Sequence, residues 1–393
     1  RPKLRFPGFD EPWQSTLLSS VFTKNAKKNT DGQITNVICN SAKQGLIPQR
    51  EYFDKDIANS DNTSGYYIIE ENDFVYNPRK SADAPYGPIS RYKYSEAGIV
   101  SPLYLCFRAK KEINPSFFEW YFRSSAWHRY VYMSGDSGAR HDRVSVKDDT
   151  FFAMPINLPS AHEQEHIASF LERIDQRIEK QRALVESLKK YKRGLLNQIF
   201  SAISKGSQRR KLRELVHVSG GKTPSMSNLL YWNGDIVWIS SKDMKSNRIY
   251  DSELKITNLA LNEMTLYHPG TLLLVARSGI LKHSLPLAIL EVDATINQDI
   301  KALQVHGCNA FYLYYAILSQ EDNIIRTLVK TGTTVQSLMM DSFLNIEIPT
   351  PDIDRQQSTI DKLAKLEKYV DVQEKELSLL SQMRNGLLQQ LFI

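Results

Sequence analysis

The chain has 393 residues, too many for one ordinary hydrophobic core, and this length predicts two or three domains. Hydrophobic residues make up 41% and charged residues 24%, which is typical of a globular protein, and the apolar runs are too short to span a membrane. The formal net charge of +6 is compatible with a polyanionic partner but is weak evidence alone.

Four segments follow one another along the chain. Residues 1–158 are predicted to form a first globular domain, and residues 159–205 a first long helix. Residues 206–350 are predicted to form a second globular domain, and residues 351–393 a second long helix. The boundaries rest on Pro-containing helix starts and on the Gly and Ser residues after the first helix.

Each globular domain mixes strand and helix patterns. In the first domain, residues 66–69 read as a strand and residues 115–132 as one amphipathic helix. In the second, residues 236–239 and 271–275 read as strands and residues 309–329 as one amphipathic helix. We therefore expect a small α+β domain in each case, with helices packed on a sheet.

The two long helices are the same segment written twice. Without a gap, Pro159 aligns with Pro351 and Gln164 with Gln356. Their apolar positions advance by three and four residues in turn, which is the heptad pattern of a coiled coil. The predicted seam consists of Leu171, Ile174, Ile178, Gln181, Val185, Leu188, Leu195, Leu363, Leu366, Val370, Gln373, Leu377, Leu380 and Leu387.

The copies also share their polar interruptions. Gln181 coincides with Gln373, and Lys192 with Arg384. Because independent solvent-facing helices would not share their defects, the pattern indicates an internal duplication of a globular domain followed by a helix. We expect the amides of Gln181 and Gln373 either to bond each other in the seam or to reach solvent at its edge.

An apolar alternation precedes each helix and predicts a short strand there. Beyond this alternation the two globular domains look unrelated, so we expect a duplicated scaffold with diverged domains. The alternating residues are Phe151, Met154 and Ile156 before the first helix, and Phe343, Ile346 and Ile348 before the second.

Known enzyme signatures are incomplete in this chain. Residues 221–223 end like a phosphate-binding loop, but Val216 stands where its first glycine belongs, and no Gly-rich loop for S-adenosylmethionine is present. Asp235 with Glu253 and Lys255 resembles the metal-binding set of a nuclease, but in so charged a chain we prefer a solvated strand edge. We therefore predict no catalytic residue and no metal site.

The cysteines and the first residues bear on the cellular compartment. Cys39, Cys106 and Cys308 are scattered without CxxC spacing, which argues against a disulfide framework and a zinc site. The first residues carry no apolar export signal. We therefore expect a cytoplasmic protein without a membrane partner.

Polar and basic residues gather in Gly-, Ser- and Asn-rich loops of both globular domains. Arg and Lys can bond guanine, Asn and Gln can bond adenine, and Ser and Thr can position phosphates. One such loop reads equally well as a solvated turn, but several loops in each of two domains favour DNA contact. The candidates are Lys24, Lys27, Lys28, Arg79, Lys80, Arg91, Lys93, Arg140, Arg143, Lys222, Lys242, Arg277, Lys282, Gln298, Thr333 and Gln336.

Several motifs occur along the chain: residues 4–9 with Trp13, residues 220–225, 231–240, 295–298 and 330–334, and the Pro-x-x-x-x-Gln start of each long helix. Together they resemble the specificity subunit of bacterial Type I restriction–modification systems. The chain departs from the family pattern at Lys222, inserted into the usual Gly-Gly-Thr-Pro, and at Arg355, where Glu is common. The resemblance covers essentially the whole chain but is weak within the first domain.

The resemblance implies an α+β fold in which two target recognition domains are separated by two long antiparallel coiled-coil helices. It implies a non-catalytic subunit whose domains each read one half of a bipartite, asymmetric double-stranded DNA target. Two modification subunits would methylate adenine N6, and two restriction subunits would translocate and cleave DNA. S-adenosylmethionine, ATP and magnesium would then bind to these partners and not to this chain.

Two alternatives belong to other functional classes. A stand-alone DNA-modifying or DNA-cleaving enzyme would act on DNA without partner subunits, against which the missing cofactor loop counts. A structural coiled-coil adaptor without a DNA role would need its heptads for an intermolecular dimer, whereas two helices of one chain can satisfy each other. Steep loss of DNA affinity with salt would favour the DNA-binding interpretation.

Overall fold

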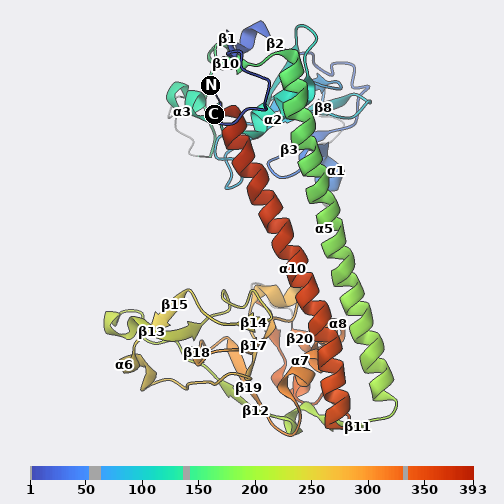
Figure 1. Cartoon of the computed structure of the whole chain (residues 1–393), viewed down its shortest axis with the longest axis vertical. Coiled ribbons are helices and arrows are strands. Elements are labelled where there is room, and N and C mark those ends of the chain that lie inside the picture. Colours follow the sequence, from blue (N-terminus) through green and yellow to red (C-terminus); the bar gives the residue numbers. More distant parts are fainter. Residues whose placement is uncertain (1, 53–62, 136–141, 331–334) are drawn as a thin grey trace. The chain divides into compact units, whose positions relative to one another are not determined.

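The computed structural model describes residues 2–52, 63–135, 142–330 and 335–393. By its internal contacts the chain divides into two compact units. Unit 1 comprises Arg1–Arg182 and Lys375–Ile393, and unit 2 comprises Ala183–Glu374. The division crosses both long helices, α5 (Ala161–Ser204) and α10 (Ile353–Phe392), so each unit holds one globular domain and part of each helix (Figure 1).

The first domain, in unit 1, is built on a four-stranded antiparallel sheet. Its strand order is β2 (Phe22–Lys24), β9 (Leu105–Ala109), β6 (Phe74–Tyr76) and β7 (Ile89–Arg91). Rings of Phe22, Phe74, Phe107 and Phe122 pack on one another in its core. The domain also contains two separate antiparallel strand pairs. The hairpin of β3 (Ile38–Ser41) and β4 (Gly45–Pro48) leads into α1 (Gln49–Tyr52), and β5 (Tyr67–Ile69) pairs with β8 (Gly98–Val100).

The second domain, in unit 2, has two sheets. The five-stranded sheet has the order β12 (Val216–Gly220), β19 (Ile300–Val305), β16 (Leu272–Val275), β17 (Leu287–Leu290) and β14 (Arg248–Ile249). The three-stranded sheet has the order β15 (Leu254–Ile256), β13 (Trp232–Ile239) and β18 (Ala294–Ile296). Short elements connect them: η4 (Leu229–Tyr231), α6 (Asn258–Leu261) and η5 (Gly279–Lys282). The predicted strands at residues 66–69, 236–239 and 271–275 are therefore present as β5, β13 and β16.

Each predicted amphipathic helix is in fact two helices. Residues 115–132 form α2 (Pro115–Arg123) and the start of α3 (His128–Ser134), and residues 309–329 form α7 (Ala310–Leu318) and α8 (Glu321–Leu328). The two helix breaks have the same structure. At each break a serine hydroxyl, of Ser124 or of Ser319, donates to a carbonyl of the preceding turn, at 2.6 and 2.8 Å. A side chain that satisfies a terminal carbonyl supports a helix end, a local effect that apolar periodicity does not reveal.

The duplication extends further into the domains than the sequence suggested. In unit 1, β1 (Gln14–Leu17) pairs antiparallel with β10 (Pro155–Leu158), and in unit 2, β11 (Gln208–Lys211) pairs with β22 (Glu347–Thr350). A short 3₁₀ turn follows each first strand, η1 (Leu18–Ser20) and η3 (Leu212–Glu214). The expectation that the domains are otherwise unrelated was wrong, because backbone pairing can be kept while side chains diverge.

The predicted strands before the long helices are shorter than expected. Ile156 and Ile348 lie in β10 and β22. Phe151 instead lies in the helix α4 (Asp148–Phe152), and Phe343 ends the helix α9 (Met340–Phe343). Both phenylalanines are buried, so the apolar pattern marked core positions correctly but joined a helix and a strand into one element.

The Pro-x-x-x-x-Gln motif has a structural role at the start of each long helix. The Gln164 side-chain amide donates to the Pro159 carbonyl at 3.0 Å, and Gln356 donates to the Pro351 carbonyl at 2.9 Å. The oxygen of Gln356 also accepts the backbone N–H of Asn309 at 2.9 Å, which ties α10 to the start of α7. Each glutamine thus satisfies a backbone carbonyl just before its helix.

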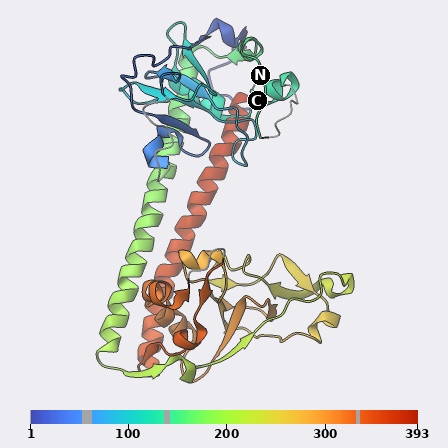
Figure 2. The same cartoon turned by 180° about the vertical axis from the view of Figure 1, so that it is seen from behind.

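Within each unit the two long helices run antiparallel and side by side (Figures 1 and 2). In unit 1, Arg177 pairs with Glu376 at 3.2 Å, and in unit 2, Lys189 pairs with Glu374 at 2.7 Å. In the part of the chain that the structure describes, no helix is long and apolar enough to cross a membrane. Gln181 belongs to unit 1 and Gln373 to unit 2, so their predicted pairing stays a prediction.

The N-terminal segment is anchored on unit 1. The backbone N–H of Leu4 donates to the carbonyl of Gln390 in α10 at 3.0 Å. Arg5 and Trp13 bond the buried carboxylate of Glu163, at 2.7 and 3.2 Å for Glu163 Oε2. In the second copy Arg355 stands at the position of Glu163 and pairs locally with Asp352. The departure from the family pattern at Arg355 therefore replaces an acid that binds Arg5 and Trp13 in the first copy with a base that pairs near its own helix start.

Candidate nucleic-acid interface

Loops of the second domain that are far apart in the sequence meet in unit 2. The backbone N–H of Lys222 donates to the Ile296 carbonyl at 3.0 Å, and the Thr223 hydroxyl donates to Gln298 Oε1 at 2.5 Å. Gly221 permits this approach, because a Cβ there would lie 2.0 Å from the Ile296 carbonyl oxygen. The motifs at residues 220–225 and 295–298 therefore form one surface, on which Lys222 and Gln298 are exposed.

A second pair of loops adjoins the first. The backbone N–H of Ala276 donates to the Asp299 carbonyl at 2.8 Å, and that of Ser278 donates to the Gln336 carbonyl at 3.1 Å. Arg277 lies opposite Ser337 in a short antiparallel bridge and is exposed. The structure thus brings together the loops that carry Lys222, Gln298, Arg277 and Gln336, and these loops form a connected polar surface.

The remaining candidates of the second domain are placed differently. Lys282 is exposed in η5, and Lys242 is exposed in the turn after β13. Lys242 also lines a cavity of about 1360 Å³ between the second domain and the helical part of unit 2. Thr333 lies outside the described residues.

Two loops of the first domain also meet. Arg79 lies opposite Arg143 in an antiparallel bridge, and the N–H of Lys80 donates to the Asp142 carbonyl at 2.8 Å. Lys27 and Lys28 are exposed in the loop after β2, and Arg140 lies outside the described residues.

Three candidates of the first domain pair with acidic residues that are distant in the sequence, and Arg143 lies 4.0 Å from the neighbouring Asp142. Lys24 pairs with Asp148 at 2.6 Å, a hydrogen bond that raises the pKa of Lys24. Lys93 pairs with Glu119 at 2.7 Å, and Arg91 lies 3.6 Å from the same carboxylate and donates to Ser116. Arg91 is half-buried. DNA contact by Arg91 and by the other candidates stays a prediction.

The carboxylate groups of the chain do not form a metal site among the described residues. No group of three or more His, Cys, Asp or Glu side chains there is arranged to hold a metal ion. In the set considered for a nuclease, Lys255 pairs with Asp251 at 3.1 Å, and the backbone N–H of Glu253 donates to Asp243 at 2.9 Å. Lys255 lies in the edge strand β15 and Glu253 directly before it, and both residues make these contacts with neighbouring loop residues.

The family model of the Type I restriction modification DNA specificity domain matches residues 11–189 and again residues 204–382. The chain belongs to this family. Each match contains one globular domain with most of the helix that follows it, so the two matches of the specificity domain correspond to the internal duplication.

Two curated relatives are named as specificity subunits of Type I restriction enzymes. The Type I restriction enzyme EcoR124I/EcoR124II specificity subunit of Escherichia coli is 38% identical over 152 residues, 38% of this chain and 38% of that protein. The MjaIX specificity subunit of Methanocaldococcus jannaschii is 30% identical over 190 residues, 47% of this chain and 43% of that protein. The matched stretches thus span less than half of either relative.

A solved structure supports the fold over the full length. A chain from work on complex assembly and conformational transition of the type I R-M system matches with a TM-score of 0.62 and 17% sequence identity. The match covers 98% of both chains. At this level of identity the match shows that the two chains share a fold.

Sequence reasoning missed the residues that connect the specificity domains to the helices. Asp175 and Glu367 are aligned acids beside the shared seam, and they bind side chains of both the domain and the opposite helix. Asp175 aligns with Glu367 as Lys192 aligns with Arg384, and this shared pattern of charges was a signal in the sequence. An alignment shows equivalence but not which side chains meet.

Proposed function

We propose that this chain is the DNA-specificity subunit of a Type I restriction–modification complex. The duplicated match to the DNA specificity domain carries the proposal. Each specificity domain binds one half of a bipartite DNA target, and the chain itself catalyses no step. The connected loops around Lys222, Gln298, Arg277 and Gln336 supply donors and acceptors of the kinds that read base edges and hold phosphates.

The long helices set the separation between the two half-sites. With 44 residues in α5 and 40 in α10, each helix is about 60 Å long at 1.5 Å per residue. This length suits half-sites whose centres lie on the order of one turn of DNA apart, about 34 Å.

The partner subunits supply the chemistry in this proposal. Two modification subunits bind S-adenosylmethionine and methylate adenine N6, and two restriction subunits use ATP and magnesium. The chain works in the cytoplasm with these subunits and double-stranded DNA, and binds no cofactor of its own. Polar loop residues without a nucleotide-binding loop are what such a division of labour requires.

Two measurements test the proposal. The purified chain is titrated with duplex DNA at increasing salt, and its affinity should fall steeply because bound phosphates release counterions. The chain is then co-expressed with its modification subunits, and methylated adenines are mapped across the host genome. A split motif with one modified adenine in each half is expected. DNA methylation or cleavage by the purified chain alone would instead support the stand-alone enzyme.

A domain exchange separates the roles of the two domains. Residues 206–350 are replaced by the corresponding domain of another specificity subunit, and methylated adenines are mapped again. One half of the motif should change while the other half and the spacer are kept. If both halves change, or neither does, the assignment of one half-site to each domain is wrong.

A further inference from the structure

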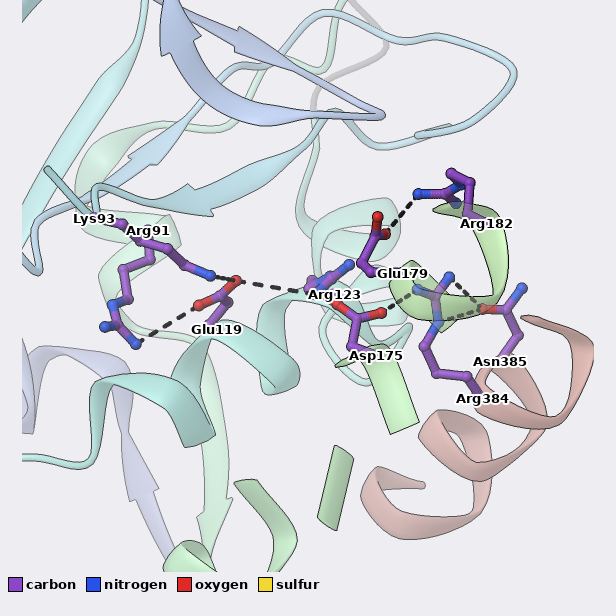
Figure 3. Close-up of polar contacts among 9 residues, drawn as sticks. All are labelled: Arg91, Lys93, Glu119, Arg123, Asp175, Glu179, Arg182, Arg384 and Asn385. Atoms are coloured by element: carbon purple, nitrogen blue, oxygen red, sulfur yellow. Dashed lines mark hydrogen bonds and ion pairs between the residues drawn. The ribbon is translucent and has the colours of Figure 1, made fainter. Parts of the chain in front are cut away.

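Asp175 on α5 joins three elements of unit 1. Its Oδ1 accepts a hydrogen bond from Arg384 Nη1 of α10 at 2.6 Å, and its Oδ2 accepts one from Arg123 Nη1 of α2 at 3.3 Å. Figure 3 shows the two guanidinium groups reaching Asp175 from different elements. One carboxylate thus connects both long helices with the first specificity domain.

The network continues into the sheet of the first domain. Arg123 lies over the ring of Trp120 at 4.4 Å and 3.9 Å from Glu119, both on the same helix α2. Glu119 in turn pairs with Lys93, and with Arg91 at the end of β7 (Figure 3). The end of α2 that reaches the helices is therefore also held to the sheet.

Glu367 on α10 has the equivalent role in unit 2. It pairs with Lys192 of α5, and it accepts hydrogen bonds from the Tyr315 hydroxyl of α7 and from Asn247 Nδ2, each at 2.9 Å. The Glu367 side chain is only 9% exposed, so these contacts are shielded from water. Again one carboxylate connects both long helices with a specificity domain.

The contacts of Asp175 and Glu367 are duplicated copies of one arrangement of charged residues. The ungapped alignment places Asp175 on Glu367 and Arg384 on Lys192, so in each unit an acid of one helix binds the aligned base of the other. The contribution of the domain differs between the two sites. When the helix breaks at Ser124 and Ser319 are aligned, Leu318 takes the position of Arg123, so the second domain has no arginine there. It uses the Tyr315 hydroxyl instead. Duplication kept the contact between the helices, while each domain evolved its own link to it.

We propose that Asp175 and Glu367 are positioning residues for DNA specificity, each of which fixes a specificity domain at one place along the helix pair and thereby sets the spacer between the half-sites. The proposal rests on the proposed DNA-specificity function. An apolar seam alone specifies register weakly, whereas a polar contact between helices penalises a shifted register by leaving charges unpaired. A displacement of about 3.4 Å, one base-pair step, is enough to change the preferred spacer.

Five variants of unit 1 test the proposal. Asp175→Asn weakens both links, Arg384→Met removes the link between the helices, and Arg123→Met removes the link to the domain. Glu179→Gln is the matched control, because Glu179 lies one turn away on the same helix and pairs only with Arg182 among the contacts drawn in Figure 3. Asp175→Glu is the conservative variant, since the second copy uses glutamate at this position.

Each variant is co-expressed with the modification subunits, and methylated adenines are mapped genome-wide. For Asp175→Asn we expect the preference for the native spacer over spacers one base pair longer or shorter to fall roughly tenfold, the equivalent of 1.4 kcal/mol. The bases of both half-sites should be unchanged. Arg384→Met and Arg123→Met should act in the same direction, whereas Glu179→Gln and Asp175→Glu should keep the native spacer.

The outcomes separate positioning from mere stabilisation. Thermal melting of each purified variant shows whether it is folded. If the folded Asp175→Asn variant keeps the native spacer preference, or if its half-site bases change instead, the positioning role is wrong. If the wild-type chain directs no split methylation motif, the proposed function fails, and this result is seen without any variant.

Discussion

Two neighbouring tyrosines of α7 have opposite polar environments. The Tyr315 hydroxyl donates to Glu367, whereas the buried Tyr314 hydroxyl has no hydrogen-bond partner among the described residues. Burial raises the pKa of both phenols, and the charge of Glu367 adds to the effect, so both stay neutral donors at physiological pH. The two side chains are similar in size and burial, but only the Tyr315 hydroxyl contributes a hydrogen bond to the stability of the fold.

This difference predicts opposite effects of removing each hydroxyl. Tyr315→Phe should lower the free energy of unfolding by about 1.5–3 kcal/mol, because a buried carboxylate loses a donor. Tyr314→Phe should leave it unchanged or raise it by up to about 1 kcal/mol, because an unsatisfied hydroxyl is removed. Urea unfolding of both variants under the same conditions measures the effect. Equal losses in the two variants would contradict this account.

His128 predicts a pH dependence of unit 1. It packs against the rings of Tyr86 and Trp127, at 4.7 and 4.6 Å between ring centroids, and burial lowers its pKa below the ordinary value of 6.5. Because the folded pKa is depressed, the neutral histidine contributes stability that is present above pH 6.5. That contribution is lost as the pH falls through the folded pKa.

A substitution isolates this contribution. In His128→Gln, the loss of stability between pH 7 and pH 5 should be smaller than in the wild-type chain, as measured by thermal melting across that range. His217→Gln serves as the control, since His217 is exposed on β12. If the melting temperatures of His128→Gln and the wild-type chain fall in parallel with acidification, His128 is not the source of the pH dependence.

At the scale of elements, the helix-start glutamines differ in what they hold. Gln164 satisfies one backbone carbonyl and is half-buried, whereas Gln356 is 3% exposed and bonds both Pro351 and the backbone of Asn309. Asn309 caps α7, since its side chain accepts the N–H of Phe311 at 2.9 Å. Gln356 therefore links the starts of two helices.

We expect the two glutamines to differ in their effect on stability. Gln356→Ala should lower the free energy of unfolding by about 1–3 kcal/mol, because it leaves buried backbone groups unpaired. Gln164→Ala should cost about 0.5–1.5 kcal/mol, the contribution of one ordinary hydrogen bond. Urea unfolding compares the two variants. A larger loss for Gln164→Ala would show that the second bond of Gln356 has no energetic importance.

At the scale of the whole molecule, the division into two units suggests where the scaffold can be lengthened. The units divide between residues 182 and 183 in α5 and between residues 374 and 375 in α10. Insertions at these points keep every described contact within each unit, including those of Asp175 and Glu367. One heptad adds about 10.5 Å to a helix, about three base-pair steps.

Inserting one heptad at both points should therefore lengthen the spacer of the methylated motif by about three base pairs and leave both half-sites unchanged. Mapping of methylated adenines in cells that express the modification subunits measures this. A heptad in only one helix is the control and should impair folding, because it shifts one side of the seam against the other. A lengthened chain that keeps the original spacer would contradict the proposed role of the helices.

The sequence by itself determined the architecture of this protein. Heptad steps and shared defects such as Lys192 and Arg384 identified two copies of one helix, and the Pro-x-x-x-x-Gln motif located both helix starts. These signals are readable because helical periodicity depends on residues three and four positions apart. The loop motifs, together with the repeated helix, were sufficient to identify the family.

Only the tertiary structure decided which distant residues meet. It brought Thr223 to Gln298 across the second domain, and it joined Arg123 and Arg384 at Asp175. It also divided each predicted amphipathic helix at an equivalent serine, where local hydrogen bonding ended a helix that apolar periodicity continued. Periodicity records which face of an element is buried, whereas the partner of a polar side chain depends on how elements pack, which no local pattern encodes.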